Sequence, residues 1–123
     1  MAMVLDTTVL IDALRGDESA IEWLLGLEHR PSCSEVTRVE IMSGLRPAER
    51  ATAERLFATL GWVPVSEAIA RAAGDLGRRF RRSHAGIGTI DLIVAATATD
   101  QGLAVATTNV EHFPMFKGLR RPY

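Results

Sequence analysis

The side chains in this sequence that are best suited to chemistry are three carboxylates, those of Asp6, Glu40 and Asp91. Each lies among apolar neighbours, and Asp6 follows the apolar pair Val4 and Leu5 directly. A set of oxygen ligands favours magnesium or manganese over zinc. Such an ion lowers the pKa of a bound water and holds a phosphodiester for in-line attack. If the three acids converge, they predict metal-dependent phosphodiester hydrolysis that requires no histidine, cysteine or serine nucleophile.

Each acid can also be explained by a structural role alone. The residues leave the catalytic and the structural explanation open. Asp6 can cap the helix that follows it, which is a common role for aspartate. Thr37 and Glu40 fit the capping-box pattern, in which a glutamate reaches back to the start of its own helix. Asp91 stands at the start of the most apolar predicted helix, where it can bond to backbone amides. A convergent site differs from these cases because mutual repulsion makes the acids take up protons until a cation neutralises them.

Several weaker candidates lie near the ends of predicted strands. Asn109 follows the fourth predicted strand, and its side-chain carbonyl can bind a hard cation but adds no negative charge. Thr8, Thr107 and Thr108 offer hydroxyl groups near the same place, although each also suits a cap or a turn. The histidines have no ligand spacing, and we expect all three at the surface: His29, His84 and His112.

Strand-like and helix-like segments alternate along the chain, which predicts a parallel sheet with helices on both faces. Short apolar runs predict strands at residues 1–5, 31–36, 62–65 and 103–107, with room for a short fifth near 119–121. Helical spacing and caps predict helices at residues 7–15, 17–29, 37–45, 47–60, 66–80 and 89–100. We therefore expect residues 1–123 to form a single domain, a three-layer α/β sandwich around a mainly parallel sheet of four to five strands.

Size and composition exclude several classes of protein. The chain has 123 residues, of which 47% are hydrophobic, so it can bury enough surface to fold without a disulfide. Cys33 is the only cysteine, which excludes an intrachain disulfide. No apolar run reaches the ~20 residues that span a bilayer, and no signal peptide is evident. We expect a soluble, cytoplasmic protein with no membrane partner. The net charge of −1 argues against coating of nucleic acid by bulk charge.

Four segments of the chain, taken in order, resemble the motifs of PIN-domain ribonucleases of the VapC toxin type, which belong to type II toxin–antitoxin systems. The segments are VLDTTVLIDALRG, SEVTRVEIMSGL, GTIDLIVAATA and AVATTNVEHF. One segment alone would be a weak signal, but four in order at the expected separations are specific and cover essentially the whole chain. The resemblance implies a PIN-like fold and magnesium-dependent cleavage of RNA by metal-activated water, with manganese able to substitute.

The resemblance also implies which residues bind the metal and catalyse the reaction. By position, the metal-binding and catalytic acids are Asp6, Glu40 and Asp91. The family often has a fourth acid in the last motif, where this chain has Asn109. This departure leaves a second metal ion in doubt, while three carboxylates can still hold one. Thr8 matches a small hydroxyl residue that commonly supports the site.

The resemblance implies partners as well. Proteins of this type are usually neutralised by a VapB-type antitoxin, whose carboxyl-terminal segment lies across the active-site groove. They often form homodimers, and apolar residues of the second and fourth predicted helices, including Trp23 and Leu56, are candidate contacts. Packing in the core of one chain explains these two residues equally well.

A cluster of arginines precedes the loop that leads to Asp91. It comprises Arg78, Arg79, Arg81 and Arg82. We hypothesise that the cluster, with Arg78 and Arg82 foremost, grips RNA phosphates beside the cut site. A solvated face at the carboxyl end of a helix, where cations are favoured, accounts for the cluster equally well.

Two competing interpretations can be compared with the nuclease. A phosphoacceptor receiver domain has similar length and order, but Val65 and Ser66 stand where it needs an aspartate, and Lys117 is misplaced for its lysine. A stronger rival is a catalytically weak or inactive PIN-fold module that binds RNA or protein. Asn109 in place of the fourth acid favours this rival.

Overall fold

Four short parallel strands form the centre of the molecule, which a computed structural model describes from residue 2 to residue 123. Across the sheet the order is β3 (Gly61–Val63), β2 (Ser32–Ser34), β1 (Met3–Leu5) and β4 (Ala104–Ala106). All pairings are parallel, with Val4 aligned to Ser32 in β2 and to Val105 in β4. The predicted parallel sheet is confirmed.

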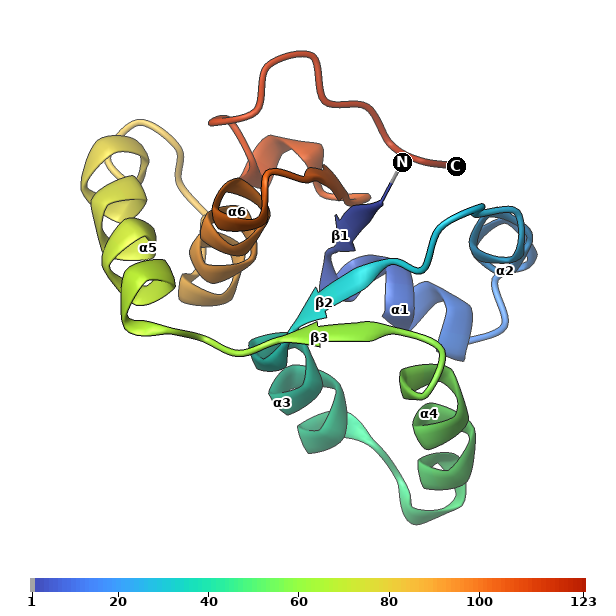
Figure 1. The fold of residues 1–123 in the computed structure, drawn as a ribbon. Helices are drawn as coiled ribbons and strands as arrows, with labels where there is room; N and C mark the ends of the chain where they lie inside the picture. The colour runs from blue at the N-terminus through green and yellow to red at the C-terminus, as the bar shows by residue number, and fades with distance from the viewer. Residues whose placement is uncertain (1) are drawn as a thin grey trace.

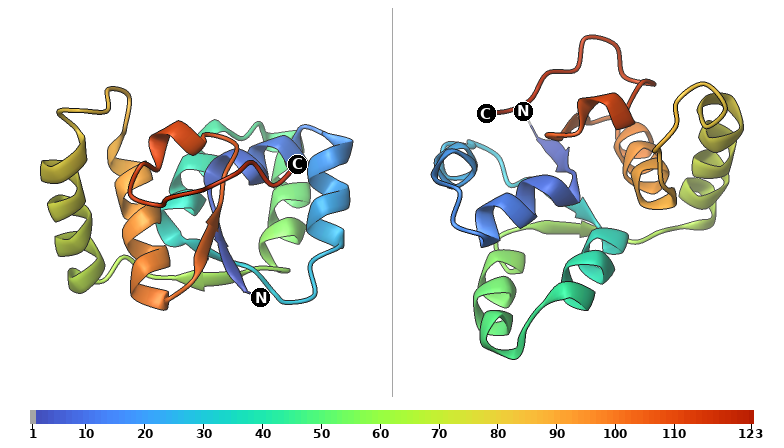
Figure 2. Two further views of the ribbon diagram at one scale, coloured as in Figure 1. Left: turned by 90° about the horizontal axis from the view of Figure 1, so that it is seen from above. Right: turned by 180° about the vertical axis from the view of Figure 1, so that it is seen from behind.

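Helices cover both faces of this sheet and make the predicted three layers (Figures 1 and 2). The described chain contains α1 (Thr7–Leu14), α2 (Glu18–Leu25), α3 (Glu35–Gly44), α4 (Arg50–Phe57), α5 (Glu67–Phe80) and α6 (Thr89–Gln101). Two 3₁₀ turns are η1 (Pro47–Glu49) and η2 (Val110–His112). Helices α1, α2 and α4 lie on one face, whereas α6 lies on the other with α5 outside it (Figure 1). Every crossover between successive strands therefore contains helix, as parallel pairing requires.

The alternation of side chains along β1 divides the core between the two faces. Val4 packs with residues of α6 and β4, whereas Leu5 packs with residues of α1 and α4. Both side chains are fully buried. Because neighbouring residues of a strand point to opposite faces, a strand buried on both sides must be apolar throughout. Among residues 2–123, no helix is long and apolar enough to cross a membrane.

Side chains that cap the helices fix where several of them begin. The carboxylates of Asp6 and Asp17 accept hydrogen bonds from backbone N–H groups at the starts of α1 and α2. Ser66 Oγ does the same for α5, 3.1 Å from the Ile69 nitrogen. These contacts satisfy donors that have no partner inside the helix. The three predicted helix starts are confirmed.

The prediction that Thr37 starts a helix was wrong. Helix α3 begins at Glu35, and the buried hydroxyl of Ser34 caps it by accepting the Val36 N–H at 3.1 Å. Thr37 therefore lies inside the helix, and its capping box with Glu40 does not form.

Other element ends also differ from the prediction. Helix α2 ends at Leu25, before Gly26, rather than near residue 29, and the segment 47–60 divides into η1 and α4. The cap of α6 is Gly88, not Thr89. Within the described residues no strand forms at 119–121, since this segment leaves Gly118 at φ +73° and runs as an irregular tail. Met1, which the first predicted strand included, lies outside the described residues.

Candidate functional site

The order of the strands places one crevice at the carboxyl ends of β1 and β4. The chain runs outward from β1 through β2 to β3 and then returns to place β4 on the other side of β1. In open parallel sheets, ligands bind at such a reversal of strand order, beyond the carboxyl ends of the strands. Asp6 is the first residue after β1 and Thr107 is the first after β4. The Asp6 N–H donates to the Ala106 carbonyl at 2.9 Å, which holds the two strand ends together.

Asp6 is buried in this crevice and is surrounded by hydrogen-bond donors. The residue is only 2% exposed to solvent. Oδ1 accepts the Thr7 N–H at 2.9 Å, while Oδ2 accepts the hydroxyls of Thr8 at 3.1 Å and Thr107 at 2.6 Å. The carboxylate is therefore both the cap of α1 and the centre of a polar cluster, so its role as a cap does not exclude a role in a site.

The pKa of Asp6 is raised above its ordinary value of 3.8. Burial is the main cause, because it disfavours the charged form of the carboxyl group. Hydrogen bonds from Thr107 and Thr8 lower the pKa without reversing the effect of burial, and the charge of Asp91 raises it further. Asp6 and Asp91 thus lie close enough for their charges to interact. A cation between them would relieve both the burial cost and the repulsion.

Asp91 lies in the first turn of α6, where Oδ2 accepts one hydrogen bond and lies close to a histidine nitrogen. The Gly88 N–H donates at 2.9 Å, and Nδ1 of His112 lies at 3.2 Å. The expected bond to a backbone amide is therefore present, but it occupies only one of the two oxygens. Of the three histidines expected at the surface, His29 and His84 are exposed. His112 is partly exposed, at 27% of its side chain, and its Nδ1 faces Asp91.

Glu40 stands apart from this pair of acids. It is exposed on α3, beside a hollow of about 150 Å³ that Ile11, Leu14 and Arg15 of the α1 region also line. In the part of the chain from residue 2 onward, no three acidic, histidine or cysteine side chains gather closely enough to hold a metal ion. The structure thus brings Asp6 and Asp91 together and leaves Glu40 outside, although the hydroxyls of Thr7 and Thr37 meet at 3.1 Å one turn before it.

The segment after β4 supplies the remaining polar groups. The Asn109 N–H donates to the Thr107 hydroxyl at 2.9 Å, and the Thr108 N–H donates to the Thr8 hydroxyl at 3.3 Å. Thr8 bonds to Asp6 through its side-chain hydroxyl, whereas Asn109 joins this network only through its backbone N–H. The sequence offered Thr107 only as one of several hydroxyls, and the pairing of β1 with β4 is what singles it out.

These groups fit a hard divalent cation. The donors available are carboxylate, hydroxyl and amide oxygens, which magnesium and manganese prefer. Two carboxylates whose charges interact across the crevice favour a cation that neutralises them. Asp6, Asp91 and the side-chain oxygen of Asn109 are the residues that could hold it, with Glu40 available from α3.

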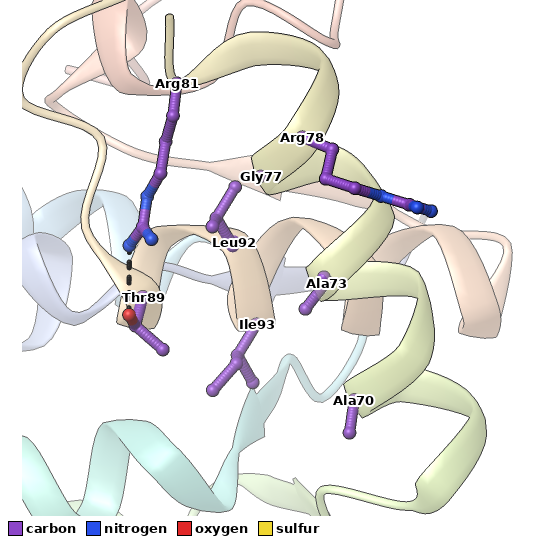
Figure 3. Close-up of a pocket in the computed structure, with 9 residues that line it drawn as sticks. Ala70, Ala73, Gly77, Arg78, Arg81, Thr89, Leu92 and Ile93 are labelled. Atoms are coloured by element: carbon purple, nitrogen blue, oxygen red, sulfur yellow. Dashed lines mark hydrogen bonds between the residues drawn. The ribbon is translucent and has the colours of Figure 1, made fainter.

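The predicted arginine cluster divides into different roles. Arg81 crosses from the end of α5 to the start of α6, where Nε donates to the Ile87 carbonyl at 3.3 Å and a terminal nitrogen donates to Thr89 Oγ1 at 3.0 Å (Figure 3). Arg78 points outward in Figure 3 and pairs with Asp75. Arg81 is thus committed to the loop ahead of α6, whereas Arg78 and Arg82 are largely exposed to solvent.

A separate hollow lies between α5 and α6 (Figure 3). It measures about 530 Å³, and alanine, glycine and apolar side chains form most of its wall. No acidic residue lines it. This hollow therefore offers no metal ligands, whereas the carboxylates of Asp6 and Asp91 lie at the sheet crevice.

Comparison with known proteins decides the family. The family model for the PIN domain matches residues 3–116. The chain is 45% identical over 123 residues to Ribonuclease VapC10 of Mycobacterium tuberculosis, covering 98% of this chain and 92% of the relative. It is 42% identical to Ribonuclease VapC19 of the same organism, with 98% of both chains covered. This chain belongs to the VapC family of PIN-domain proteins.

Solved structures agree with this assignment. A toxin–antitoxin complex from Klebsiella pneumoniae contains a chain that matches this VapC-family chain with a TM-score of 0.82 and 25% identity, over 98% of each chain. The family and the PIN-like sandwich predicted from the four motif segments are therefore both confirmed.

Proposed function

We propose that this VapC-family chain is a magnesium-dependent endoribonuclease toxin, with manganese able to substitute, and that residues 1–123 act as its single nuclease domain. The observation that carries the proposal is the pair formed by Asp6 and Asp91 at the sheet crevice, where burial and repulsion raise the pKa of Asp6. The reaction type is supported by relatives that are named ribonucleases over nearly their full length.

The proposed roles follow from the contacts of each side chain. Asp6 and Asp91 hold the cation, Asn109 and Thr8 support them, and Glu40 is the third acid, which joins from α3 when metal and RNA are bound. When bound, the ion neutralises the carboxylates and lowers the pKa of water for in-line attack on a phosphodiester. The Thr107 hydroxyl orients Asp6 and favours its ionised form, because its hydrogen bond offsets part of the rise in pKa that burial causes.

The decisive experiment measures RNA cleavage with magnesium, with manganese and with a chelator. We expect cleavage only with metal, and we expect Asp6→Asn and Asp91→Asn to abolish it. Asp100→Asn is the matched control, since Asp100 is exposed at the far end of α6. Cleavage that persists in the chelator, or acid variants as active as the parent, would contradict the proposal.

The alternative is a PIN-fold module that binds RNA or protein without effective catalysis. It is favoured by the position of Glu40 outside the acid pair and by the uncharged Asn109. The two functions separate cleanly in one assay. A catalytically inactive module binds RNA with equal affinity before and after Asp91→Asn and cleaves none, whereas the nuclease loses turnover in that variant.

We further propose RNA contacts at the exposed arginines of α5. Arg78 and Arg82 are solvent-exposed and can reach a phosphate without breaking a buried contact. Replacing each with glutamine should weaken RNA binding and reduce its salt dependence by about one phosphate contact. Arg71→Gln is the control, because Arg71 lies on the same helix and pairs with Glu67 at 2.8 Å. Unchanged affinity and salt dependence would refute these contacts.

The proposed partner is a VapB-type antitoxin that covers the acid pair in the cytoplasm, where the RNA substrate is found. Its support is the likeness to a chain of a toxin–antitoxin complex. We also propose a homodimer, to which Leu25, 81% exposed on α2, is better placed to contribute than the half-buried Trp23 and Leu56. Co-purification with the protein encoded beside this chain and sedimentation of the pure chain test the two partners separately.

A further inference from the structure

His112 occupies an unusual position for a residue with no predicted role. It ends η2, the turn that follows β4 by a few residues, and its side chain is only 27% exposed. Nδ1 lies 3.2 Å from Oδ2 of Asp91. The next residue, Phe113, is fully buried in the core beneath α6. The histidine is therefore fixed by the backbone on one side and by the acid on the other.

The opposite edge of the His112 ring faces the loop before α6. Gly86 in this loop has φ +94°, a conformation that favours glycine. A methyl group added to Gly86 would come within 3.4 Å of Nε2 of His112. The ring thus fills the space between the loop and Asp91, and its two nitrogens face different partners.

The acceptors and donors around Asp91 define which ring nitrogen carries hydrogen. An ionised carboxylate can only accept hydrogen bonds, so a hydrogen bond across this 3.2 Å contact requires hydrogen on Nδ1. The Gly88 N–H already supplies the bond that the start of α6 requires. A second donor on the same oxygen is therefore unnecessary for capping. Both contacts fall on Oδ2. Oδ1 of Asp91 therefore has no hydrogen bond from residues 2–123 and is available to a cation.

One short segment thus contacts both acids of the pair. Thr107 donates to Oδ2 of Asp6 at the start of this segment, and His112 contacts Oδ2 of Asp91 at its end. Each acid is held by one oxygen from the same side of the crevice. The segment from residue 107 to residue 112 therefore sets how the two carboxylates face each other.

We propose that His112 is a positioning residue of the metal site, which holds Asp91 by Oδ2 so that Oδ1 faces the cation. This inference rests on the proposed function, because it requires that Asp6 and Asp91 bind a divalent ion. Groups that orient metal ligands in this way typically change metal affinity by about 10–100-fold when they are removed.

The test measures manganese binding to the RNA-free protein by electron paramagnetic resonance, which counts free ions and needs no catalytic activity. Three variants separate donor geometry from packing: His112→Asn keeps an amide donor near the place of Nδ1, whereas His112→Gln moves it one bond further and His112→Leu removes it. We expect Asn to retain most of the affinity, and Gln and Leu to lose about 10-fold or more. His84→Leu, at an exposed histidine that contacts Ser83, should bind manganese like the parent.

The possible results distinguish the two proposals. If the parent binds manganese and the Gln and Leu variants bind it equally well, the role of His112 is refuted while the metal site stands. If Asn is as weak as Leu, the histidine acts through packing, and positioning by Nδ1 is refuted. If the parent and Asp91→Asn both bind no manganese, the proposed metal site fails and His112 has no such role. Should His112→Leu fail to fold by urea unfolding, the Asn and Gln variants, which differ by one methylene, decide the matter.

Discussion

Replacing Thr107 with valine removes a single hydroxyl from a fully buried site and leaves the shape of the side chain almost unchanged. This hydroxyl donates to Asp6 Oδ2 at 2.6 Å and accepts the Asn109 N–H at 2.9 Å. A hydrogen bond to a charged group contributes about 1.5–3 kcal/mol, and one between neutral groups about 0.5–1.5 kcal/mol. We therefore expect Thr107→Val to lower the free energy of unfolding by about 2–4 kcal/mol at neutral pH.

The size of this loss should depend on pH through Asp6. The hydrogen bond from Thr107 lowers the pKa of Asp6, so the variant should have an Asp6 pKa that is raised further above 3.8. Since the bond is strongest to the ionised carboxylate, it stabilises the fold most at pH values where Asp6 is charged. Below the ordinary value of 3.8, Asp6 is protonated in both the folded and the unfolded chain, and the charged part of the loss disappears.

Urea unfolding followed by circular dichroism, in the presence of a chelator, measures this loss at pH 8 and at acid pH. A loss of about 2–4 kcal/mol corresponds to a midpoint lower by about 1–2 M urea. Thr107→Ser is the control, because it keeps the hydroxyl and loses only a methyl group. A Val variant as stable as the Ser variant at pH 8, or equally destabilised at both pH values, would refute the role assigned to this hydroxyl.

Three further predictions concern the charge of Asp6, the loop before α6 and the cap of α3. Because folded Asp6 keeps its proton to higher pH than unfolded Asp6, the metal-free stability contributed by this group falls as pH rises above 3.8. Asp6→Asn should remove that fall in urea titrations between pH 4 and 8. Magnesium at 100 times its dissociation constant should raise the free energy of unfolding of the parent, but not of Asp6→Asn, by about 2.7 kcal/mol. Equal stabilisation of the parent and the variant would contradict this prediction. Arg81→Gln should cost about 1 kcal/mol and speed hydrogen exchange at residues 84–88, since two bonds to the start of α6 are lost. Arg82→Gln should change neither the stability nor the rate of hydrogen exchange. Equal exchange rates in the two variants would disprove that Arg81 holds this loop. Ser34→Ala should cost about 1 kcal/mol in thermal unfolding because it removes the cap of α3, whereas an unchanged melting temperature would show that the cap is dispensable.

The sheet and its helices could be predicted from the sequence because local patterns determine them. Apolar runs such as Val4-Leu5 are long enough for a buried strand and too short for a helix, and Ser66 marks the start of α5 clearly. Alternation of strands and helices then leaves a parallel sheet as the simplest arrangement. The place of Asp6 at a strand end followed from the same reasoning.

The errors arose where two local signals compete or where distant segments meet. Ser34 and Thr37 are both good caps, and only the burial of the Ser34 hydroxyl at the end of β2 decides between them. His112 has no sequence spacing to Asp91 that indicates contact, because η2 meets α6 only through the return of the chain after β4. The contacts of Glu40 depend on the conformation of a long exposed side chain, which no pattern of residues fixes.

The pairing of β4 with β1 joins parts of the chain that a ribosome makes at very different times. Thr107 reaches Asp6 across 101 positions, and His112, which contacts Asp91, comes later still. A nascent chain that stops short of residue 107 can form the early helices but cannot complete the crevice, since contacts distant in sequence form only after the intervening loop has closed. The surroundings of the two acids are thus completed only after the ribosome has made the segment from residue 107 to residue 112.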